Sequence, residues 1–339
     1  MTALLEVTNL KTHFFTRDGV VRAVDGVTFT LEAGQTLAIV GESGSGKSVT
    51  ALSLMRLVAE PPGKIVDGSI MLRGENVLEM NDAAVRNLRG DRIAMIFQDP
   101  MTSLNPVFRV GYQIAEALRI HKNMDLKAAN ARAVEMLDLV GIPNAAERAR
   151  DYPHQFSGGM RQRAMIAMAL ACDPDILIAD EPTTALDVTI QAQILELMIE
   201  MQQRTGAAII MITHDLGVVA DMAHGVMVMY AGKQVEYASA DGIFYEPLHP
   251  YTWGLLDSLP RHDVDEKGSL LPIEGQPPSL IDVPSGCAFH PRCPFAKEIC
   301  HQQTPELREV RPDHLAACHF AGDPGFARGE ASPTGEAVS

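Results

Sequence analysis

Long apolar runs are missing from this sequence. No stretch approaches the roughly 18 uninterrupted apolar residues of a membrane-spanning helix. The first fifteen residues run into a strand-like pattern and lack the layout of a signal peptide. We therefore expect a protein that stays in the cytoplasm and acts at a membrane only through a membrane-embedded partner.

Basic residues are also few relative to acidic ones. The chain has 28 Lys and Arg against 43 Asp and Glu, a formal net charge of -15. Such a charge repels a phosphate backbone, so nucleic acid is not expected as the main partner. Internal repeats and coiled-coil heptads are absent, while 46% hydrophobic and 21% charged residues are typical of a globular protein.

Cysteine is scarce but unevenly placed. Cys172 stands alone in an apolar helical pattern, and the other four occur as Cys287-x5-Cys293-x6-Cys300-x17-Cys318. In a cytosolic chain such a cluster favours a bound metal over disulfides. A small loop-rich segment also needs a metal or a cross-link to stabilise it, because it buries little core. Four thiolates suit a 4Fe–4S cluster or a tetrahedral zinc ion, and the spacing leaves both open. The histidines that keep zinc open are His290, His301 and His319.

The order of patterns along the chain predicts an α/β fold. Buried strand-like runs at 35–40, 175–180 and 207–213 alternate with helical patterns, which indicates a three-layer domain around a largely parallel sheet. This domain is predicted to span 1–245, with an inserted helical subdomain at about 85–160. A segment rich in Pro, Gly and Cys, 246–322, follows as a compact extension, and 323–339 reads as a disordered tail.

A phosphate-binding loop follows the first buried strand. The segment Gly41-Glu-Ser-Gly-Ser-Gly46-Lys47-Ser48 matches the full P-loop pattern and opens a helical run. Its glycines let backbone N–H groups point at phosphate, and the helix N-terminus adds positive potential. Lys47 is expected to neutralise β- and γ-phosphate oxygens and Ser48 to bind Mg²⁺. The predicted nucleotide-binding residues of the loop are Gly41, Ser43, Gly44, Ser45, Gly46, Lys47 and Ser48.

Two more strands end in residues suited to ATP hydrolysis. Asp180 closes one strand, where it can hold Mg²⁺, and Glu181 follows as the predicted general base for water. His214 follows the third strand and is predicted to contact the γ-phosphate. An acidic strand end and a structural histidine are the plainer interpretations of these residues, and the P-loop upstream argues against both.

Three further motifs resemble those of one family. Phe156-Ser157-Gly158-Gly159-Met160, running into the Asp180 strand and the segment TTALDV, resembles the signature helix, Walker B and D-loop of ABC-transporter ATPases. Gln98 resembles the Q-loop glutamine, a catalytic residue and Mg²⁺ ligand, and His214 the switch histidine. The resemblance covers residues 5–240 and implies a RecA-like core with an N-terminal antiparallel β part.

The family resemblance also implies a head-to-tail dimer. ATP would lie between one P-loop and the other subunit's Ser157, Gly158 and Gly159, with Asp187 contacting the opposite subunit. Phe14 matches the aromatic residue that stacks on adenine, although Phe15 adjoins it. The signature departs from the family's LSGGQ at both ends, which leaves the serine and glycines intact and indicates a subgroup.

The subgroup resembled is the ATPases of oligopeptide and dipeptide importers. FSGGM-RQR, the HPYT at 249–252 and the pattern PSGCxFHPRC carry this likeness, and GESGSGKSV resembles their D-type subunit. The resemblance implies a heterodimer with an F-type ATPase, two permease subunits and an extracytoplasmic binding protein, at the cytoplasmic face of the membrane. It also favours a 4Fe–4S cluster over zinc or no metal at Cys287, Cys293, Cys300 and Cys318.

The expected function is therefore ATP hydrolysis, with ATP and Mg²⁺, that energises peptide import. An importer of nickel, glutathione or another small solute is the main alternative. A soluble ABC ATPase that acts on DNA or ribosomes would carry a long coiled-coil insertion or two tandem cassettes, and neither is present. A nucleotide-regulated scaffold without hydrolysis would lack the base or the switch histidine.

Overall fold

The computed structural model describes residues 3–99, 103–183, 188–258 and 273–329. The chain divides into two compact units. The first comprises the described residues of Met1–Leu5, Leu31–Thr36 and Leu72–Ile212, and the second those of Glu6–Thr30, Leu37–Met71 and Thr213–Ser339. In the part of the chain that is described, no helix is long and apolar enough to cross a membrane.

A parallel sheet lies at the centre of the first unit. Its strands are β6 (Ile93–Ile96), β7 (Ile176–Asp180) and β8 (Ala208–Thr213). β7 lies between the other two and pairs in parallel with each. Every residue of these strands is buried, as expected where helices cover both faces of a parallel sheet. The strands predicted at 175–180 and 207–213 are therefore present within one residue of the predicted bounds.

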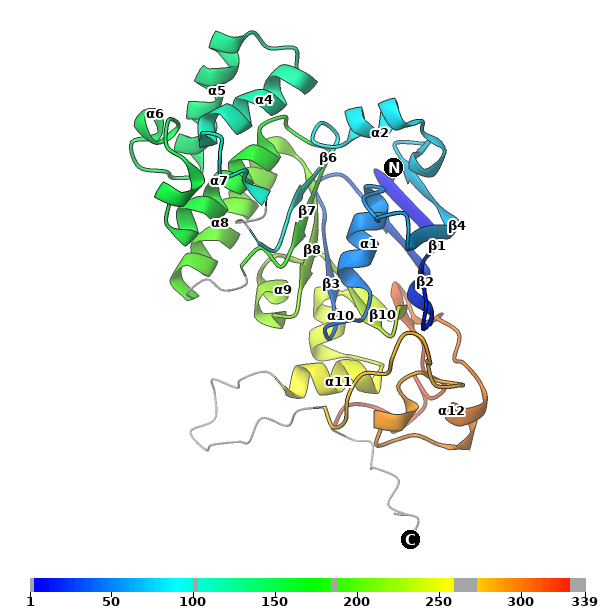
Figure 1. Ribbon diagram of the computed structural model, residues 1–339. Helices are drawn as coiled ribbons and strands as arrows, with labels where there is room; N and C mark the ends of the chain where they lie inside the picture. The colour runs from blue at the N-terminus through cyan, green and yellow to red at the C-terminus, as the bar shows by residue number, and fades with distance from the viewer. Residues whose placement is uncertain (1–2, 100–102, 184–187, 259–272, 330–339) are drawn as a thin grey trace. The chain divides into compact units, whose positions relative to one another are not determined.

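Helices make up most of the rest of the first unit. α4 and α5 pack against each other and against α7, and α7 also packs against β6 (Figure 1). Asn81, Asp125 and Ser157 cap the N-termini of α2, α5 and α7 by accepting a backbone N–H. The helices are α2 (Asp82–Leu88), α4 (Val110–His121), α5 (Leu126–Leu139), α6 (Ala145–Arg148), α7 (Gly158–Leu170) and α8 (Val188–Thr205). Short elements complete it: β5 (Glu75–Asn76), η1 (Val77–Glu79) and η2 (Pro153–Gln155).

The predicted helical range 85–160 contains α4, α5 and α6 in full. It also contains β6, a strand that the sequence analysis did not identify. The run Ile93–Ile96 has only four residues, and a short apolar run does not distinguish a strand from a buried helical turn. Pairing with β7 decides its conformation.

Two groups of strands form the second unit. In the first, β1 (Leu5–Thr16) lies between β2 (Gly19–Leu31) and β4 (Gly63–Leu72), and the two-residue connection between β1 and β2 makes them an antiparallel hairpin. In the second, β3 (Thr36–Val40) pairs in parallel with β9 (Gly225–Tyr230). α1 (Lys47–Leu54) follows β3, and α9 (Leu216–Met222) precedes β9.

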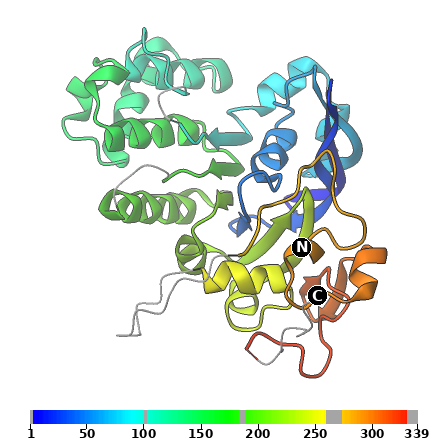
Figure 2. The same ribbon diagram turned by 60° about the horizontal axis from the view of Figure 1, so that its bottom comes forward.

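The C-terminal region adds strands to the second group. β10 (Lys233–Ser239) pairs antiparallel with β9 and with β12 (His314–Ala316), and β12 pairs with β11 (Arg308–Arg311). The predicted boundary at 245 therefore falls between two strands of one sheet. The helical elements of this region are α10 (Ala240–Tyr245), α11 (Pro250–Asp257), η3 (His290–Arg292) and α12 (Glu298–Gln302), shown in Figure 2.

A buried carboxylate joins these C-terminal elements. Glu236 is fully buried and accepts hydrogen bonds from the backbone N–H groups of Leu248 (2.6 Å) and His249 (3.1 Å) and from the hydroxyl of Thr252. Oε1, the oxygen that accepts from Leu248, also lies 2.8 Å from Nε2 of His314 in β12. A buried carboxylate needs such hydrogen-bond partners. Glu236 of β10 therefore connects the HPYT segment at 249–252 and strand β12 to the sheet.

Aromatic packing continues beyond β12. Phe326 lies against Trp253 of α11 with ring centroids 5.1 Å apart, and Arg328 donates 2.7 Å to Asp257. The predicted disordered tail, 323–339, thus begins in a segment with packed side chains. From 330 onward it lies outside the described residues.

Candidate functional site

The P-loop residues lie between β3 and α1. Gly46 has φ +106°, and a Cβ there would come within 2.2 Å of the Ala23 carbonyl oxygen. Gly41 is equally constrained, because a Cβ would lie 2.3 Å from the carbonyl oxygen of Met229 in β9. Only glycine fits both positions without a shift of the backbone. The loop is therefore folded tightly against β2 and β9.

Lys47 is held within its own loop. Its side chain is 6% exposed, and Nζ donates to the carbonyl oxygens of Gly41 (2.7 Å) and Glu42 (3.0 Å). Ser48 is exposed at the first turn of α1, beside the exposed residues Ser43 and Gly44. The loop thus presents its hydroxyl and helix N-terminus to solvent while the ammonium group stabilises the turn.

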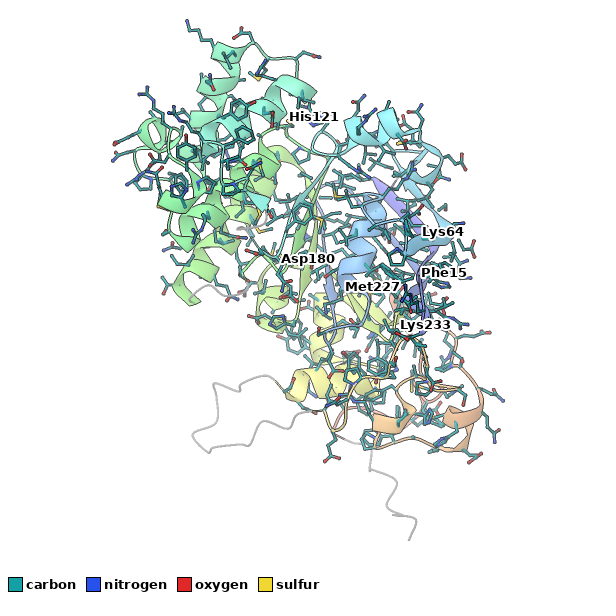
Figure 3. The ribbon with its side chains drawn as sticks, in the orientation of Figure 1. Phe15, Lys64, His121, Asp180, Met227 and Lys233 are labelled. Carbon is teal, nitrogen blue, oxygen red and sulfur yellow. The ribbon has the colours of Figure 1, made fainter. Side chains whose placement is uncertain are left out.

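The Walker B carboxylates follow at the end of β7. Asp180 is 8% exposed and closes the strand (Figure 3). Glu181 has φ +48°, a conformation that costs a non-glycine residue on the order of 1–2 kcal/mol. Its N–H donates 2.9 Å to the Ile212 carbonyl oxygen, which extends the β7–β8 pairing by one residue. Backbone strain of this kind is concentrated at functional sites.

The Q-loop glutamine reaches this carboxylate. Nε2 of Gln98, which follows β6 by two residues, donates 2.8 Å to Oε2 of Glu181. The structure therefore brings together two of the three predicted catalytic residues, from the ends of neighbouring parallel strands. The third, His214, follows β8 and is exposed.

The signature residues open α7. Ser157 is the N-cap, with its Oγ accepting 3.3 Å from the N–H of Met160. Ser157 and Gly158 are exposed, and a Cβ on Gly158 would meet no described atom within 4 Å. Packing among the described residues therefore does not require glycine at 158.

A glutamine that the sequence analysis did not single out links two of these motifs. Gln162, in the second turn of α7, is 2% exposed and donates from Nε2 to the carbonyl oxygen of Pro182. The signature helix is thereby fixed to the chain that follows Glu181. The one feature of the sequence that could have indicated this role is the spacing of four residues, about one helical turn, between Gly158 and Gln162.

The remaining predicted residues are placed less distinctly. Phe14 is half-buried, and a Cβ on Gly63 would lie 2.9 Å from its ring. Phe15 is 52% exposed and is labelled in Figure 3. Asp187 lies outside the described residues.

The four cysteines of the C-terminal region line one cavity, shared with His249, His290 and four phenylalanines among others. All four thiols are free of disulfides. Burial, and then neighbouring thiolates, raise the pKa of Cys293 to about 12 and that of Cys318 to about 11. Among the described residues, no three His, Cys, Asp or Glu side chains gather closely enough to hold a single metal ion. Neither the predicted 4Fe–4S cluster nor a zinc ion therefore gains support from the structure at these cysteines.

Comparison with protein-family models identifies the class. Residues 24–184 match the ABC transporter family, and 235–300 match the oligopeptide/dipeptide transporter C-terminal region. The chain therefore belongs to the ABC transporter ATPases. A dimeric ATP-binding cassette in a post-hydrolysis state bound to ADP and Pi is similar in structure, with a TM-score of 0.63 and 25% identity over 70% of this chain and 98% of that one.

Individual relatives cover almost the whole chain. The dipeptide transport ATP-binding protein DppD of Bacillus subtilis is 54% identical over 94% of this chain and 95% of its own length. The oligopeptide transport ATP-binding protein OppD of Escherichia coli is 54% identical over 93% of both chains. A probable peptide ABC transporter ATP-binding protein of Sinorhizobium fredii is 53% identical over 93% of this chain and 94% of its own.

Proposed function

We propose that this chain hydrolyses ATP to energise an importer of dipeptides and oligopeptides. The observation that carries the proposal is an identity of 53–54% to peptide-transport ATP-binding proteins over more than nine tenths of the chain. This likeness includes the C-terminal region and not only the cassette. Peptide is thus favoured over nickel, glutathione or another small solute.

The nucleotide site is proposed to consist of the motif residues predicted from the sequence. The P-loop N–H groups and Lys47 bind the phosphates, and Phe14 or the more exposed Phe15 stacks on adenine. Ser48, Gln98 and Asp180 are the proposed Mg²⁺ ligands, and the ion, when bound, neutralises charge that develops on the phosphate oxygens. Hydroxyl, amide and carboxylate oxygens are the ligand types that Mg²⁺ takes, so these residues fit it.

Hydrolysis is proposed to depend on Glu181. Its carboxylate accepts a proton from the attacking water, whose oxygen forms a bond to the γ-phosphorus as the bond to the β–γ bridging oxygen breaks. Gln98 holds that carboxylate through a 2.8 Å hydrogen bond, and His214 contacts the γ-phosphate. The products are ADP and inorganic phosphate.

A second ABC ATPase is proposed to complete each site. The exposed N-terminus of α7, with Ser157, Gly158 and Gly159, binds the γ-phosphate of ATP held by the partner, and Asp187 contacts that partner. The partner is an F-type subunit in a heterodimer. Two permease subunits and an extracytoplasmic binding protein complete the importer, with this chain at the cytoplasmic face of the inner membrane.

Uptake measurements test the substrate. In a strain that lacks this chain, we expect loss of uptake of labelled dipeptides and tripeptides, with recovery by the wild-type chain and none by Lys47→Ala. Nickel and glutathione uptake should not change. Normal peptide uptake together with a defect for nickel or glutathione would contradict the peptide proposal and leave the ATPase proposal standing.

We also propose that Cys287, Cys293, Cys300 and Cys318 hold a 4Fe–4S cluster. The resemblance of this segment to the importer ATPases supports the proposal, and all four thiols lie around one small cavity. The test is the content of iron and acid-labile sulfide, with the visible absorption spectrum, in protein purified without oxygen. We expect about four of each per chain, little in Cys293→Ser, and the wild-type amount in Cys172→Ala. Iron-free protein with full ATPase activity would contradict the proposal.

A further inference from the structure

Glu42 is a P-loop residue with no proposed role in nucleotide binding, and its N–H, carbonyl and carboxylate groups are all hydrogen-bonded. Its N–H donates 2.8 Å to the hydroxyl of Tyr251 in α11. Its carbonyl oxygen accepts from Lys47, and its carboxylate accepts two hydrogen bonds from Arg292, at 2.6 and 2.9 Å. Two of these three partners come from the C-terminal region.

Arg292 is built into the structure rather than lying on its surface. Its side chain is 5% exposed in the ion pair with Glu42. Nε donates 2.9 Å to the carbonyl oxygen of Glu274, and both terminal nitrogens have further acceptors within 3.4 Å. The guanidinium carbon also lies 5.9 Å from the ring centroid of Tyr230 and 6.0 Å from that of Phe289. A bidentate pair with every arm occupied fixes its partner in one orientation.

Electrostatics give this pair a consequence for ATP. Glu42 belongs to the loop that receives phosphate, and an unpaired carboxylate there would repel the nucleotide. The Arg292 guanidinium cancels that charge and keeps the carboxylate turned toward the C-terminal region. It also leaves the carbonyl oxygen of Glu42 in place to hold Lys47.

We infer that Arg292 is a positioning residue for ATP, by which the C-terminal region sets the conformation and charge of the P-loop through Glu42. The inference rests on the proposed nucleotide site. Arg292 directly precedes Cys293 and ends the 3-10 turn that begins three residues after Cys287. The cysteine-containing loop and the P-loop are therefore coupled through one guanidinium group.

The test uses the full chain in its purified transport complex, with steady-state hydrolysis measured over a range of ATP concentrations. We expect Arg292→Ala to raise KM for ATP by about 10-fold, with a smaller change in kcat, because it leaves the half-buried Glu42 carboxylate without its cation beside the phosphate site. Arg292→Lys keeps the charge but loses the bidentate geometry, and should raise KM by a smaller factor. This second variant serves if Arg292→Ala does not fold.

Removing the stranded charge should restore part of the affinity. The double variant Glu42→Gln with Arg292→Ala should have a KM at least about 3-fold below that of Arg292→Ala alone, since the repulsive carboxylate is gone. A merely structural role would lower the melting temperature of both variants without this recovery. Arg311→Ala, which breaks an exposed ion pair with Glu246 in the same region, is the matched control and should leave KM unchanged.

The outcomes separate this inference from the proposed function. If the wild-type complex hydrolyses ATP and Arg292→Ala has the same KM, the inference is wrong and the function stands. An equal KM in the double variant and in Arg292→Ala would also overturn it. If the wild-type complex binds no nucleotide, the proposed function fails and the inference fails with it.

Discussion

The substitution Glu181→Gln separates the binding of ATP from its hydrolysis. The amide has the size of the carboxylate and keeps an oxygen that can accept the 2.8 Å hydrogen bond from Gln98. The backbone conformation at φ +48° and the strand pairing through the N–H of Glu181 do not depend on the side-chain charge. The folded structure should therefore persist, while the group that accepts a proton from water is lost.

The size of the effect follows from this role. General base catalysis contributes about 10²–10⁴-fold in rate, which corresponds to roughly 3–5 kcal/mol of transition-state stabilisation. We expect kcat for phosphate release to fall by that factor with KM little changed. ATP, and not ADP, should then remain bound when the complex is separated from free nucleotide by gel filtration.

A matched control is available on α8. Glu200 is exposed and pairs with Arg204, and Glu200→Gln should hydrolyse ATP at the wild-type rate. A Glu181→Gln complex with near-normal phosphate release would remove Glu181 from the role of base. It would also refute the argument that the Gln98 contact holds a catalytic carboxylate.

Two further predictions concern adenine and acid. Phe14 and Phe15 compete for the adenine role, and loss of stacking typically costs about 1–3 kcal/mol. We therefore expect an increase of roughly 10-fold in the Kd of ATP for Ala at one position and little change at the other. Equal, small effects would contradict an aromatic stacking role in this segment.

Burial lowers the pKa of His249 to about 4, below its ordinary value of about 6.5. The folded chain therefore favours the neutral imidazole, while the unfolded chain takes up a proton as the pH falls below about 6.5. The contribution of His249 to the free energy of unfolding is complete above about pH 6.5 and falls by roughly 3 kcal/mol as the pH drops toward 4. Asparagine at 249 can still cap the helix but does not titrate. The free energy of unfolding in urea should therefore fall less between pH 7.5 and pH 4.5 for His249→Asn than for the wild type. Equal decreases in the two proteins would contradict this prediction.

The strands and the phosphate-binding loop could be predicted from sequence because their signals are local. β3, β7 and β8 are short, wholly buried and mostly apolar runs that lie within one residue of the expected bounds. β7 and β8 end in Asp180 and Thr213, and β3 leads directly into the glycines of the P-loop. Gly46 is constrained by its positive φ and by the nearby Ala23 carbonyl oxygen. The spacing of the glycines in the sequence indicates such positions directly, because only glycine fits them. The family then follows from the order of the motifs.

Contacts between distant segments could not be predicted in the same way. Arg292 lies 250 residues from Glu42 in the sequence, and the sequence around either residue does not predict their contact. Glu236 and His314 meet because β12 returns to β10, a pairing that no periodicity encodes. The choice of Phe14 over Phe15 also depends on which ring faces the nucleotide, and neighbouring residues of a strand differ only in the face to which they point.

Affinity purification of this chain from gently solubilised native membranes tests the central claim most directly. The co-purifying proteins are identified by mass, and ATP hydrolysis is measured on the same material. We predict two multi-span permease subunits and a second ABC ATPase, together with hydrolysis that Lys47→Ala abolishes. Recovery of soluble factors or nucleic acid in place of permeases would contradict the assignment to transport and leave only an ATPase.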